Sequence, residues 1–257
     1  MSLINVSNLT FSYEGSYDNI FENVSFQIDT DWKLGFIGRN GRGKTTFLNL
    51  LLGKYAYSGN ISSTVKFEYF PYDVEDKSLY TIEVMKSICT ECMDWEIFRE
   101  ISLLDVQEDA LYRPFNTLSN GEQTKVLLAA LFLTASCFLL IDEPTNHLDI
   151  DARNVVQNYL KRKKGFILVS HDRSLLDQCV DHILSINKTN IEIQKGNFTS
   201  WWENKTLQDN FELAENKKLL KEIGRLSYAA KRSSNWSNKV EKSKYGTTNS
   251  GSKLDKG

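Results

Sequence analysis

Apolar and polar residues alternate along the first part of the chain. The stretches "LINVSNLTF" (3–11) and "VSFQI" (24–28) have this period of two, which is typical of half-buried antiparallel strands. A short apolar run at 33–38 then leads through glycines into "KTTFLNLLLG" (44–53), whose amphipathic spacing and final glycine indicate a helix. The opening of the chain therefore predicts two strands, a buried strand, a loop and a helix.

The pattern changes after residue 60. The stretch "NISSTVKFEYF" (60–70) predicts a hairpin, and 80–114 has helical spacing that Pro114 ends. A further helix is expected to begin with Ser119 as its N-cap. Its expected buried side comprises Val126, Leu127, Ala130 and Leu131.

Three continuous apolar runs follow, and helical segments separate them. They are "CFLLID" (137–142), "GFILVS" (165–170) and "HILSI" (182–186). Runs of this kind are typical of parallel strands that are covered on both faces, so the predicted fold class is α/β.

Residues 203–245 have a different character, with one glycine, no proline and many lysines, glutamates, asparagines and leucines. They predict one long helix with a narrow apolar seam. The seam consists of Leu207, Phe211, Ala214, Leu219, Ile223, Leu226 and Ala230. It slips by a residue after Ala214, so a regular coiled coil is not expected. Residues 247–257 have linker composition, and we expect them to form a flexible tail or the tip of a linker.

Composition narrows the possible classes of protein. With 257 residues, 41% of them hydrophobic, the chain can form one large domain and a smaller attachment. It has no apolar run of membrane-spanning length and no secretory signal, so we expect a cytoplasmic protein without a membrane domain. Residues 201–257 carry 12 Lys/Arg and 7 Asp/Glu, a net charge of +5, which leaves −7 for the rest. Two readings of this basic segment stay open: a solvated helix, or contact with a polyanion such as RNA.

Four cysteines stand at positions 89, 92, 137 and 179, and the three histidines are scattered. A closed zinc site needs four ligands, so the single "CTEC" does not predict one. We expect reduced, mostly buried thiols.

The stretch "GRNGRGKT" (38–45) fits the phosphate-loop pattern G-x-x-x-x-G-K-[ST] and stands between the predicted strand and helix. Glycines let successive backbone N–H groups point inward, and the helix N-terminus adds positive potential. Lys44 is expected to reach the β and γ phosphates, and Thr45 to offer its hydroxyl to Mg²⁺.

The apolar run at 137–142 ends in two adjacent carboxylates. Asp142, at the strand tip, can hold Mg²⁺ through water. Glu143 projects one residue further, where it can orient the attacking water or accept its proton. A buried acid pair without such a role would be costly.

Four motifs, "GRNGRGKT", "LSNGEQ", "LLIDEPTNHLD" and "ILVSHDR", have the order and approximate spacing seen in ATP-binding cassette (ABC) ATPases. The resemblance covers residues 1–200. It implies an ABC-type P-loop core with an antiparallel β subdomain and a helical subdomain, followed here by a long C-terminal helix. It also implies that Tyr13 stacks on adenine, that Asp142 and Thr45 hold Mg²⁺, and that Glu143 and His171 are catalytic. The implied nucleotide-binding residues of the loop are Gly38, Arg39, Asn40, Gly41, Arg42, Gly43, Lys44, Thr45 and Thr46.

In this family the "LSGGQ"-like loop caps the γ-phosphate held by a second cassette, and two cassettes face each other head to tail. Ser119, Asn120, Gly121 and Glu122 occupy that loop here. The chain has one phosphate loop and one such signature. The resemblance therefore implies that it supplies halves of two ATP sites and needs a second cassette.

One position departs from the family pattern. A glutamine usually approaches Mg²⁺ after this segment, whereas "YFPYDV" offers Tyr72. A phenol can form hydrogen bonds but is longer and more rigid than an amide, so the role of this loop is open.

"DEPTNHLD" together with "LSNGEQ" resembles the ABC-F subfamily, in which a helical arm joins two cassettes that act on the ribosome. The resemblance implies that residues 201–246 are the first helix of that arm and that the chain is the front part of a ribosome-protection protein of the antibiotic-resistance type. Trp201, Trp202 and the "KRKK" run at 161–164 could contact RNA, but packing and a solvated helix end are the simpler readings. The alternative is the free-standing ATPase subunit of a membrane transporter; a chromosome ATPase would need longer coiled coils.

Overall fold

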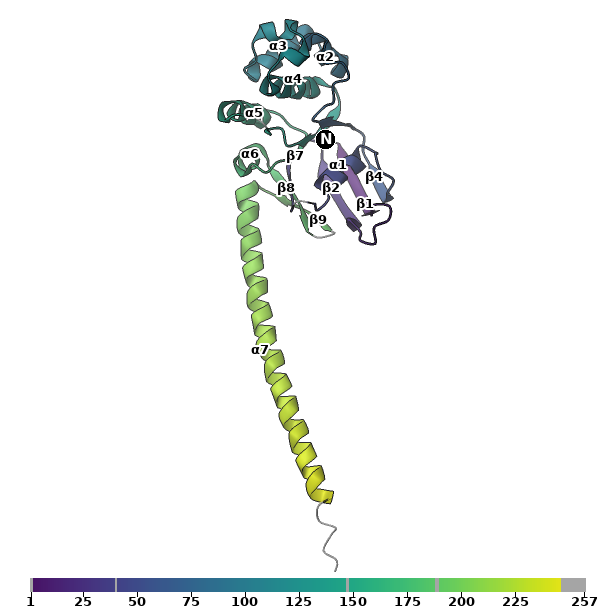
Figure 1. The fold of residues 1–257 in the computed structure, drawn as a ribbon, viewed down its shortest axis with the longest axis vertical. Coiled ribbons are helices and arrows are strands. Elements are labelled where there is room, and N and C mark those ends of the chain that lie inside the picture. The colour runs from purple at the N-terminus through teal and green to yellow at the C-terminus, as the bar shows by residue number, and fades with distance from the viewer. Residues whose placement is uncertain (1, 40, 147, 188–189, 246–257) are drawn as a thin grey trace, which may run out of the picture. The chain divides into compact units, whose positions relative to one another are not determined.

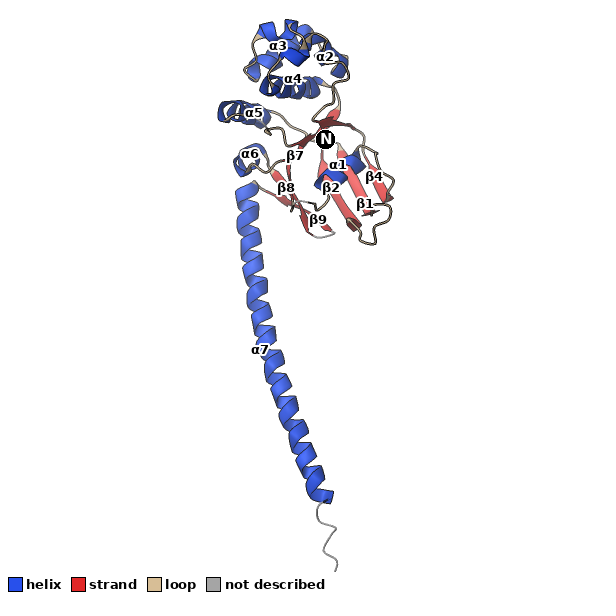
Figure 2. Ribbon diagram, in the orientation of Figure 1, coloured by secondary structure: helices blue, strands red, loops and turns tan. Residues whose placement is uncertain are grey.

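A computed structural model describes residues 2–39, 41–146, 148–187 and 190–245 (Figure 1). The chain divides into two compact units, residues 1–201 and 202–257. The predicted flexible segment 247–257 lies outside the described residues. Helices and strands both contribute to the first unit, as the α/β prediction required (Figure 2).

An antiparallel sheet of three strands contains the alternating segments of the N-terminus. Its strands are β1 (Leu3–Phe11), β2 (Phe21–Asp29) and β4 (Ser58–Ser62), in the order β2-β1-β4. Ile4, Val6 and Leu9 are buried, while Ser7 and Asn8 between them are exposed. This alternation gives the sheet one face for the core and one face for water.

A second sheet holds the apolar runs. Its strands are β5 (Lys66–Phe70), β6 (Cys137–Asp142), β7 (Phe166–Val169), β3 (Lys33–Ile37), β8 (His182–Asn187) and β9 (Asn190–Lys195), in that spatial order. All neighbours pair in parallel except β8 and β9. Successive residues of β6 belong to two different apolar clusters. Leu139 and Ile141 lie in one cluster, and Phe138 and Leu140 lie in the other. The parallel strands are therefore covered on both faces, as their continuous apolar runs predicted.

The hairpin predicted for residues 60–70 is wrong. β4 pairs antiparallel with β1, whereas β5 pairs in parallel with β6, so the chain passes from one sheet to the other through residues 63–65. The sequence there, "SST" followed by valine, lacks the glycine or asparagine that a tight hairpin turn requires. The side chains of β5 also gain apolar neighbours beside β6, because Phe67 packs against Phe138.

Short helices form the predicted helical subdomain: α2 (Thr81–Ile88), α3 (Asp94–Leu103) and α4 (Asn120–Leu133), with 3₁₀ turns at Glu108–Tyr112 and Phe115–Thr117. Figure 1 shows α2, α3 and α4 grouped together. Ser119 is the N-cap of α4, as predicted, and all residues from Lys125 to Leu131 are buried. The helix α1 (Lys44–Leu51) follows β3, and α5 (Ile150–Arg162) and α6 (Arg173–Cys179) follow β6 and β7.

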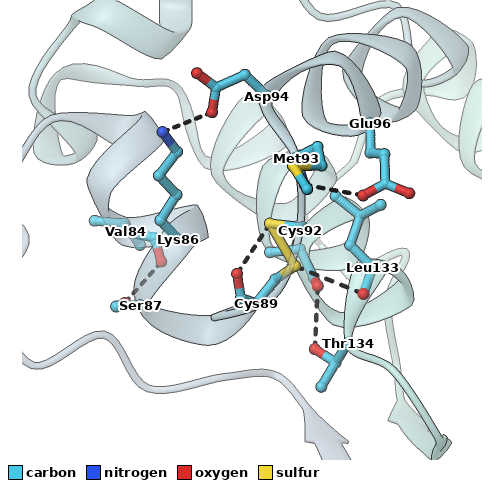
Figure 3. Close-up of a disulfide and its surroundings, with 11 residues drawn as sticks. Val84, Lys86, Ser87, Cys89, Cys92, Met93, Asp94, Glu96, Leu133 and Thr134 are labelled. Carbon is cyan, nitrogen blue, oxygen red and sulfur yellow. Dashed lines mark hydrogen bonds and ion pairs between the residues drawn. A yellow bond between two sulfur atoms is a disulfide. The ribbon is translucent and has the colours of Figure 1, made fainter.

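The cysteines follow the expectation only in part. Cys137 and Cys179 are free thiols, and Cys179 is buried. Cys89 and Cys92 instead form a disulfide between the end of α2 and the turn before α3 (Figure 3), so the prediction of reduced thiols is wrong for this pair. Their Cα atoms are 5.6 Å apart, which is within the usual range for a disulfide.

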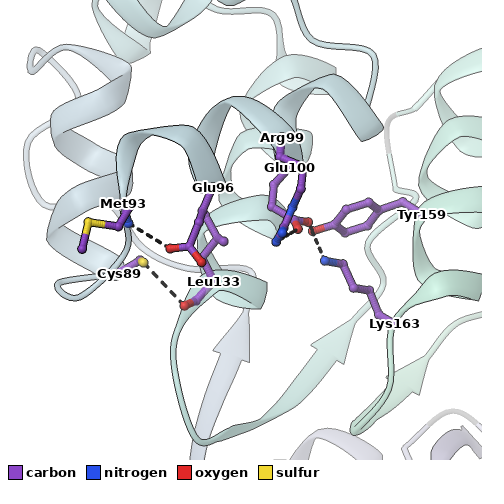
Figure 4. A network of polar contacts seen from close by, with 8 residues as sticks. All are labelled: Cys89, Met93, Glu96, Arg99, Glu100, Leu133, Tyr159 and Lys163. Carbon is purple, nitrogen blue, oxygen red and sulfur yellow. Dashed lines mark hydrogen bonds and ion pairs between the residues drawn. The ribbon is translucent and has the colours of Figure 1, made fainter.

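A buried carboxylate connects α3 to the end of α5 (Figure 4). Glu100 is 1% exposed, and it accepts hydrogen bonds from the Tyr159 hydroxyl at 2.6 Å and the Lys163 ammonium at 2.5 Å. Burial alone would raise the pKa of Glu100, but the bonds from Lys163, Tyr159 and Arg99 lower it below its ordinary value. The carboxylate is therefore charged and paired at neutral pH.

The helix α7 (Phe198–Tyr245) belongs to the first unit only as far as Trp201. Phe198 and Trp201 pack against the apolar cluster of the first unit, which favours packing over RNA stacking for Trp201. From residue 202 onward nearly every described side chain is exposed, including Leu207, Phe211 and Leu226 of the seam. Among the described helices, none has the length and hydropathy needed to cross a membrane.

Replacing Glu100 with glutamine should lower the free energy of unfolding at pH 7 by about 3–5 kcal/mol, because Lys163 would lose its buried partner. A carboxyl whose pKa is lowered in the folded state stabilises above the unfolded value of about 4.3, and this stabilisation is lost as the pH falls through the folded value. The difference between Glu100→Gln and wild type should therefore shrink below about pH 4. Urea unfolding at pH 7 and pH 3.5 measures it.

The matched control is Glu91→Gln, in the same subdomain, because Glu91 is exposed. Its unfolding free energy should stay within about 0.5 kcal/mol of wild type. An equally small effect of Glu100→Gln at pH 7 would contradict the claim that the Glu100–Lys163 ion pair stabilises the fold.

Candidate active site

The phosphate-loop sequence connects the end of β3 to the start of α1. Gly41 and Gly43 have φ values of 75° and 94°, a region that side chains with a Cβ rarely adopt. A Cβ on Gly43 would also collide with the side chain of Ile20. Gly43 caps α1 without a side-chain bond, so the N–H groups of the first turn remain available to an anion. Asn40 lies outside the described residues.

Lys44 is held by the loop itself. Its ammonium donates to the carbonyl of Gly38 at 2.9 Å and lies 3.5 Å from the carbonyl of Arg39. Burial lowers the pKa of Lys44, and the nearby carboxylates of Asp142 and Glu143 act in the opposite direction. The Lys44 ammonium is therefore already held over the phosphate loop, by its bond to the Gly38 carbonyl, before a phosphate binds.

Asp142, at the end of β6, receives two hydroxyl groups on one oxygen. Thr45 Oγ1, in the first turn of α1, donates to Asp142 Oδ2 at 3.1 Å, and Tyr69 Oη, from β5, donates to the same atom at 3.1 Å. Burial and the neighbouring Asp142 carboxylate raise the pKa of Tyr69 well above its ordinary value, so the phenol stays a donor. The structure thus places the two predicted metal-binding side chains in direct contact.

Glu143 has a different environment from its neighbour. Its backbone lies at a φ of 51°, which is uncommon for a residue other than glycine, and its N–H donates to the Val169 carbonyl at 2.9 Å. Among the described residues, no group donates a hydrogen bond to its buried Oε1. His171 Nε2, in the loop after β7, lies 3.6 Å from this oxygen. The two predicted catalytic side chains therefore lie together, although Glu143 Oε1 accepts no hydrogen bond within the described part of the chain.

Burial raises the pKa of Glu143, although His171 and Lys44 act to lower it. A strained backbone and an unpaired buried oxygen both cost stability, and such features cluster at functional sites. The carboxyl is in this way a better proton acceptor than an exposed glutamate.

Tyr13 lies just beyond the end of β1 and is partly exposed. Its hydroxyl is 2.8 Å from Thr46 Oγ1, which joins it to the phosphate loop. The rings of Phe11 and Tyr55 meet it edge to face, at centroid distances of 5.1 and 5.7 Å. This aromatic group gives Tyr13 a fixed position beside the loop.

The signature residues form a compact helix cap. Ser119 Oγ accepts from the Glu122 N–H at 3.2 Å, and the Glu122 carboxylate accepts from the Ser119 N–H at 2.8 Å. These bonds lower the pKa of Glu122. Asn120 and Gly121 begin α4. Within the described part of the chain, no hydrogen bond or ion pair joins residues 119–122 to the phosphate loop, and the loop's helix α1 stands apart from α4 in Figure 1.

Sequence reasoning missed Tyr69. Tyr72, where the resemblance led us to expect a glutamine, is instead partly buried against the apolar cluster that contains Leu139 and Ile141. The pairing of β5 with β6 is the signal that could have found Tyr69, because it sets Tyr69 opposite Leu140, two residues before Asp142. The wrongly predicted hairpin concealed that pairing.

These residues fit a magnesium–nucleotide complex. Mg²⁺ is usually bound by one or two carboxylates together with substrate phosphates, rather than by a cage of protein ligands. The site matches that requirement, because Asp142 and Thr45 stand beside a glycine loop and a lysine. In the described residues there is no cluster of three or more His, Cys, Asp or Glu that could hold a metal without a substrate.

Replacing Glu143 with glutamine should raise the free energy of unfolding at pH 7 by about 1 kcal/mol, because it removes a carboxylate whose charged form burial disfavours. A carboxyl with a raised folded pKa stabilises fully below the unfolded value of about 4.3, and this contribution is lost as the pH rises through the folded value. The advantage of Glu143→Gln should therefore disappear near pH 4. Thermal and urea unfolding of Glu143→Gln and wild type at pH 7 and pH 4 measure this difference in the free energy of unfolding.

Asp142→Asn is the contrasting variant. It should lower the unfolding free energy by about 1–2 kcal/mol, since Thr45 and Tyr69 would lose their charged acceptor. If Asp142→Asn and Glu143→Gln lower the free energy of unfolding equally, the claim that only Asp142 gains stability from its hydrogen bonds is wrong.

Comparison with known proteins found one family model and several relatives that match part of the chain. The ABC transporter family model matches residues 21–146. The chain is 31% identical over 201 residues to the ribosome protection protein VmlR of Bacillus subtilis, covering 74% of this chain and 35% of that protein. It is 34% identical over 187 residues to the erythromycin resistance ATP-binding protein MsrA of Staphylococcus epidermidis, covering 70% of this chain and 34% of that protein.

A plant relative and a solved structure extend the comparison. ABC transporter F family member 5 of Arabidopsis thaliana is 27% identical over 210 residues, covering 79% of this chain and 30% of that protein. A metal-chelate type ABC transporter in an inward-facing conformation has a TM-score of 0.63 at 20% identity, covering 76% of this chain and 83% of that one, and this likeness concerns the fold. The chain spans about a third of the length of the three relatives named here.

Proposed function

We propose that the chain carries an ABC transporter ATPase domain, and that it binds and hydrolyses Mg-ATP as one of two cassettes that work together. The observation that carries the proposal is the bond from Thr45, which follows Lys44 in the phosphate-loop sequence, to Asp142 at the end of β6, 3.1 Å long. Such an arrangement suits phosphoryl transfer, in which positioning and charge stabilisation do most of the work.

Each residue of the site has a proposed role. The loop residues 38–46 hold the phosphates, with Lys44 at the β and γ groups, while Tyr13 stacks on the adenine. Thr45 and Asp142 would hold Mg²⁺, which neutralises charge on the phosphates when bound. Glu143 orients the attacking water and accepts its proton, and His171 contacts the γ-phosphate.

The signature residues Ser119, Asn120, Gly121 and Glu122 serve the ATP of a second cassette. Their separation from the chain's own phosphate loop supports this assignment, as does the position of Ser119 at a helix N-terminus, where anions are stabilised. A single chain is then weakly active or inactive, and a second cassette, in a longer protein or in a second copy, completes each site.

We further propose that the cassette is the first of an ABC-F protein that acts on the ribosome in the cytoplasm and confers antibiotic resistance by ribosome protection. The names of two relatives, a ribosome protection protein and an erythromycin resistance protein, support this reading. Residues 201–246, with their positive net charge, would form the first helix of the arm that joins two cassettes.

Mixing two inactive variants tests the divided site. Lys44→Ala should abolish nucleotide binding, and Ser119→Ala should leave binding intact but stop hydrolysis. In an equal mixture of the two variants, half of the dimers contain one copy of each. Such a dimer has one intact ATP site of two, made of the phosphate loop of the Ser119→Ala copy and the signature of the Lys44→Ala copy. About a quarter of the wild-type ATPase rate should therefore return.

Lys66→Ala, an exposed lysine on β5, is the binding control and should change nothing. Because Ser119 is also an N-cap, thermal unfolding must show that its variant is folded. A strictly monomeric preparation that hydrolyses ATP at full rate without Ser119 would refute the divided site.

The cellular partner is tested with Glu143→Gln, which should hold ATP without hydrolysing it. In the protein that joins this chain to its second cassette, the variant should sediment with ribosomes in cell extracts supplied with ATP, and wild type should do so less. Lys44→Ala is the matched control and should stay out of the ribosome fraction. Recovery with membranes would favour the alternative, the ATPase subunit of a transporter.

A further inference from the structure

Tyr69 brings a hydroxyl to the metal acid from outside the phosphate loop. Its Oη donates to Asp142 Oδ2 at 3.1 Å, the same oxygen that accepts from Thr45 at 3.1 Å. The two donors come from different elements, β5 and α1. A carboxylate oxygen with two hydroxyl donors is fixed in orientation, because each bond has a preferred direction.

The position of Tyr69 is set by strand pairing and by packing. β5 lies parallel to β6, with Tyr69 opposite Leu140, so the ring stands beside the strand that ends in Asp142. The ring is partly buried against the apolar cluster shared by the two sheets. The Lys54 ammonium lies 5.4 Å from the ring centroid, which adds a favourable contact with its face.

Tyr72, three residues later, is directed elsewhere. It packs against the apolar cluster that contains Leu139 and Ile141, whereas Tyr69 packs against the cluster that contains Phe138 and Leu140. In the described residues its hydroxyl makes no hydrogen bond to Asp142 or Glu143, while that of Tyr69 does contact Asp142. The side chain at the position of the family glutamine is thus not the one that reaches the site.

We propose that Tyr69 is a positioning residue that orients Asp142 and thereby sets the affinity of the nucleotide site for Mg²⁺. The proposal rests on the proposed function, since it requires the chain to bind Mg-ATP. Groups that hydrogen-bond to metal ligands hold them in the geometry that the metal requires, and their removal commonly weakens metal binding. Tyr69 acts through Asp142 and need not touch the nucleotide.

The test compares Tyr69→Phe with Tyr72→Phe, because each removes one hydroxyl and keeps the ring. Equilibrium binding of a fluorescent ATP analogue is measured in EDTA and during titration with Mg²⁺. Tyr69→Phe should raise the Mg²⁺ concentration at half-saturation by about tenfold. Its nucleotide affinity in EDTA should remain that of wild type, and Tyr72→Phe should match wild type in both measurements.

The other outcomes separate the two proposals. An unchanged Mg²⁺ response in Tyr69→Phe, or a shift found in Tyr72→Phe instead, would overturn the role of Tyr69. Weaker binding in EDTA by Tyr69→Phe would also overturn it, since the hydroxyl would then support the fold and not the metal. If wild type binds the nucleotide with no response to Mg²⁺, the proposed function itself fails, and the role of Tyr69 fails with it.

Discussion

Parallel pairing of β6 with its neighbours is the constraint on which the site depends. In a parallel sheet all strands end at the same edge, so residues far apart in the chain meet there. Asp142 and Glu143 follow β6, His171 follows β7, and the phosphate loop follows β3. β5 belongs to the same group and brings Tyr69 to the edge. The apolar runs allow these strands to be buried on both faces and to pair in parallel. The same pairing therefore brings the polar side chains that follow the strands to one edge of the sheet.

The two adjacent acids show how one strand end creates two chemical environments. Asp142 Oδ2 accepts from two hydroxyls, whereas Glu143 Oε1 is buried without a donor among the described residues. The backbone of Glu143 is left-handed, a strained conformation of the kind that clusters at functional sites. One carboxylate is thus fixed by two hydroxyl donors, whereas burial raises the pKa of the other.

The sequence could predict those features that depend on local pattern. The phosphate loop, the Ser119 cap and the strand that ends in Asp142 follow from glycine spacing, capping chemistry and apolar runs, and the structure contains all three. The contact of Tyr69 with Asp142 depends on which strand pairs with β6, and "KFEYF" fits an edge strand of either sheet. The bond between Tyr13 and Thr46 likewise depends on tertiary approach, which no local pattern encodes. The Cys89–Cys92 disulfide is different, because it joins two residues only three apart in the chain.

The buried Glu100 has a mechanical consequence for the helical subdomain. It lies on α3, while Tyr159 and Lys163 lie on α5 and just after it. Displacement of α3 from α5 would remove the bonds from Tyr159 and Lys163 and leave the Glu100 carboxylate only the Arg99 bond from its own helix. Breaking a largely buried ion pair in this way is costly. We therefore expect α3 and the end of α5 to move together as one rigid body while these bonds hold.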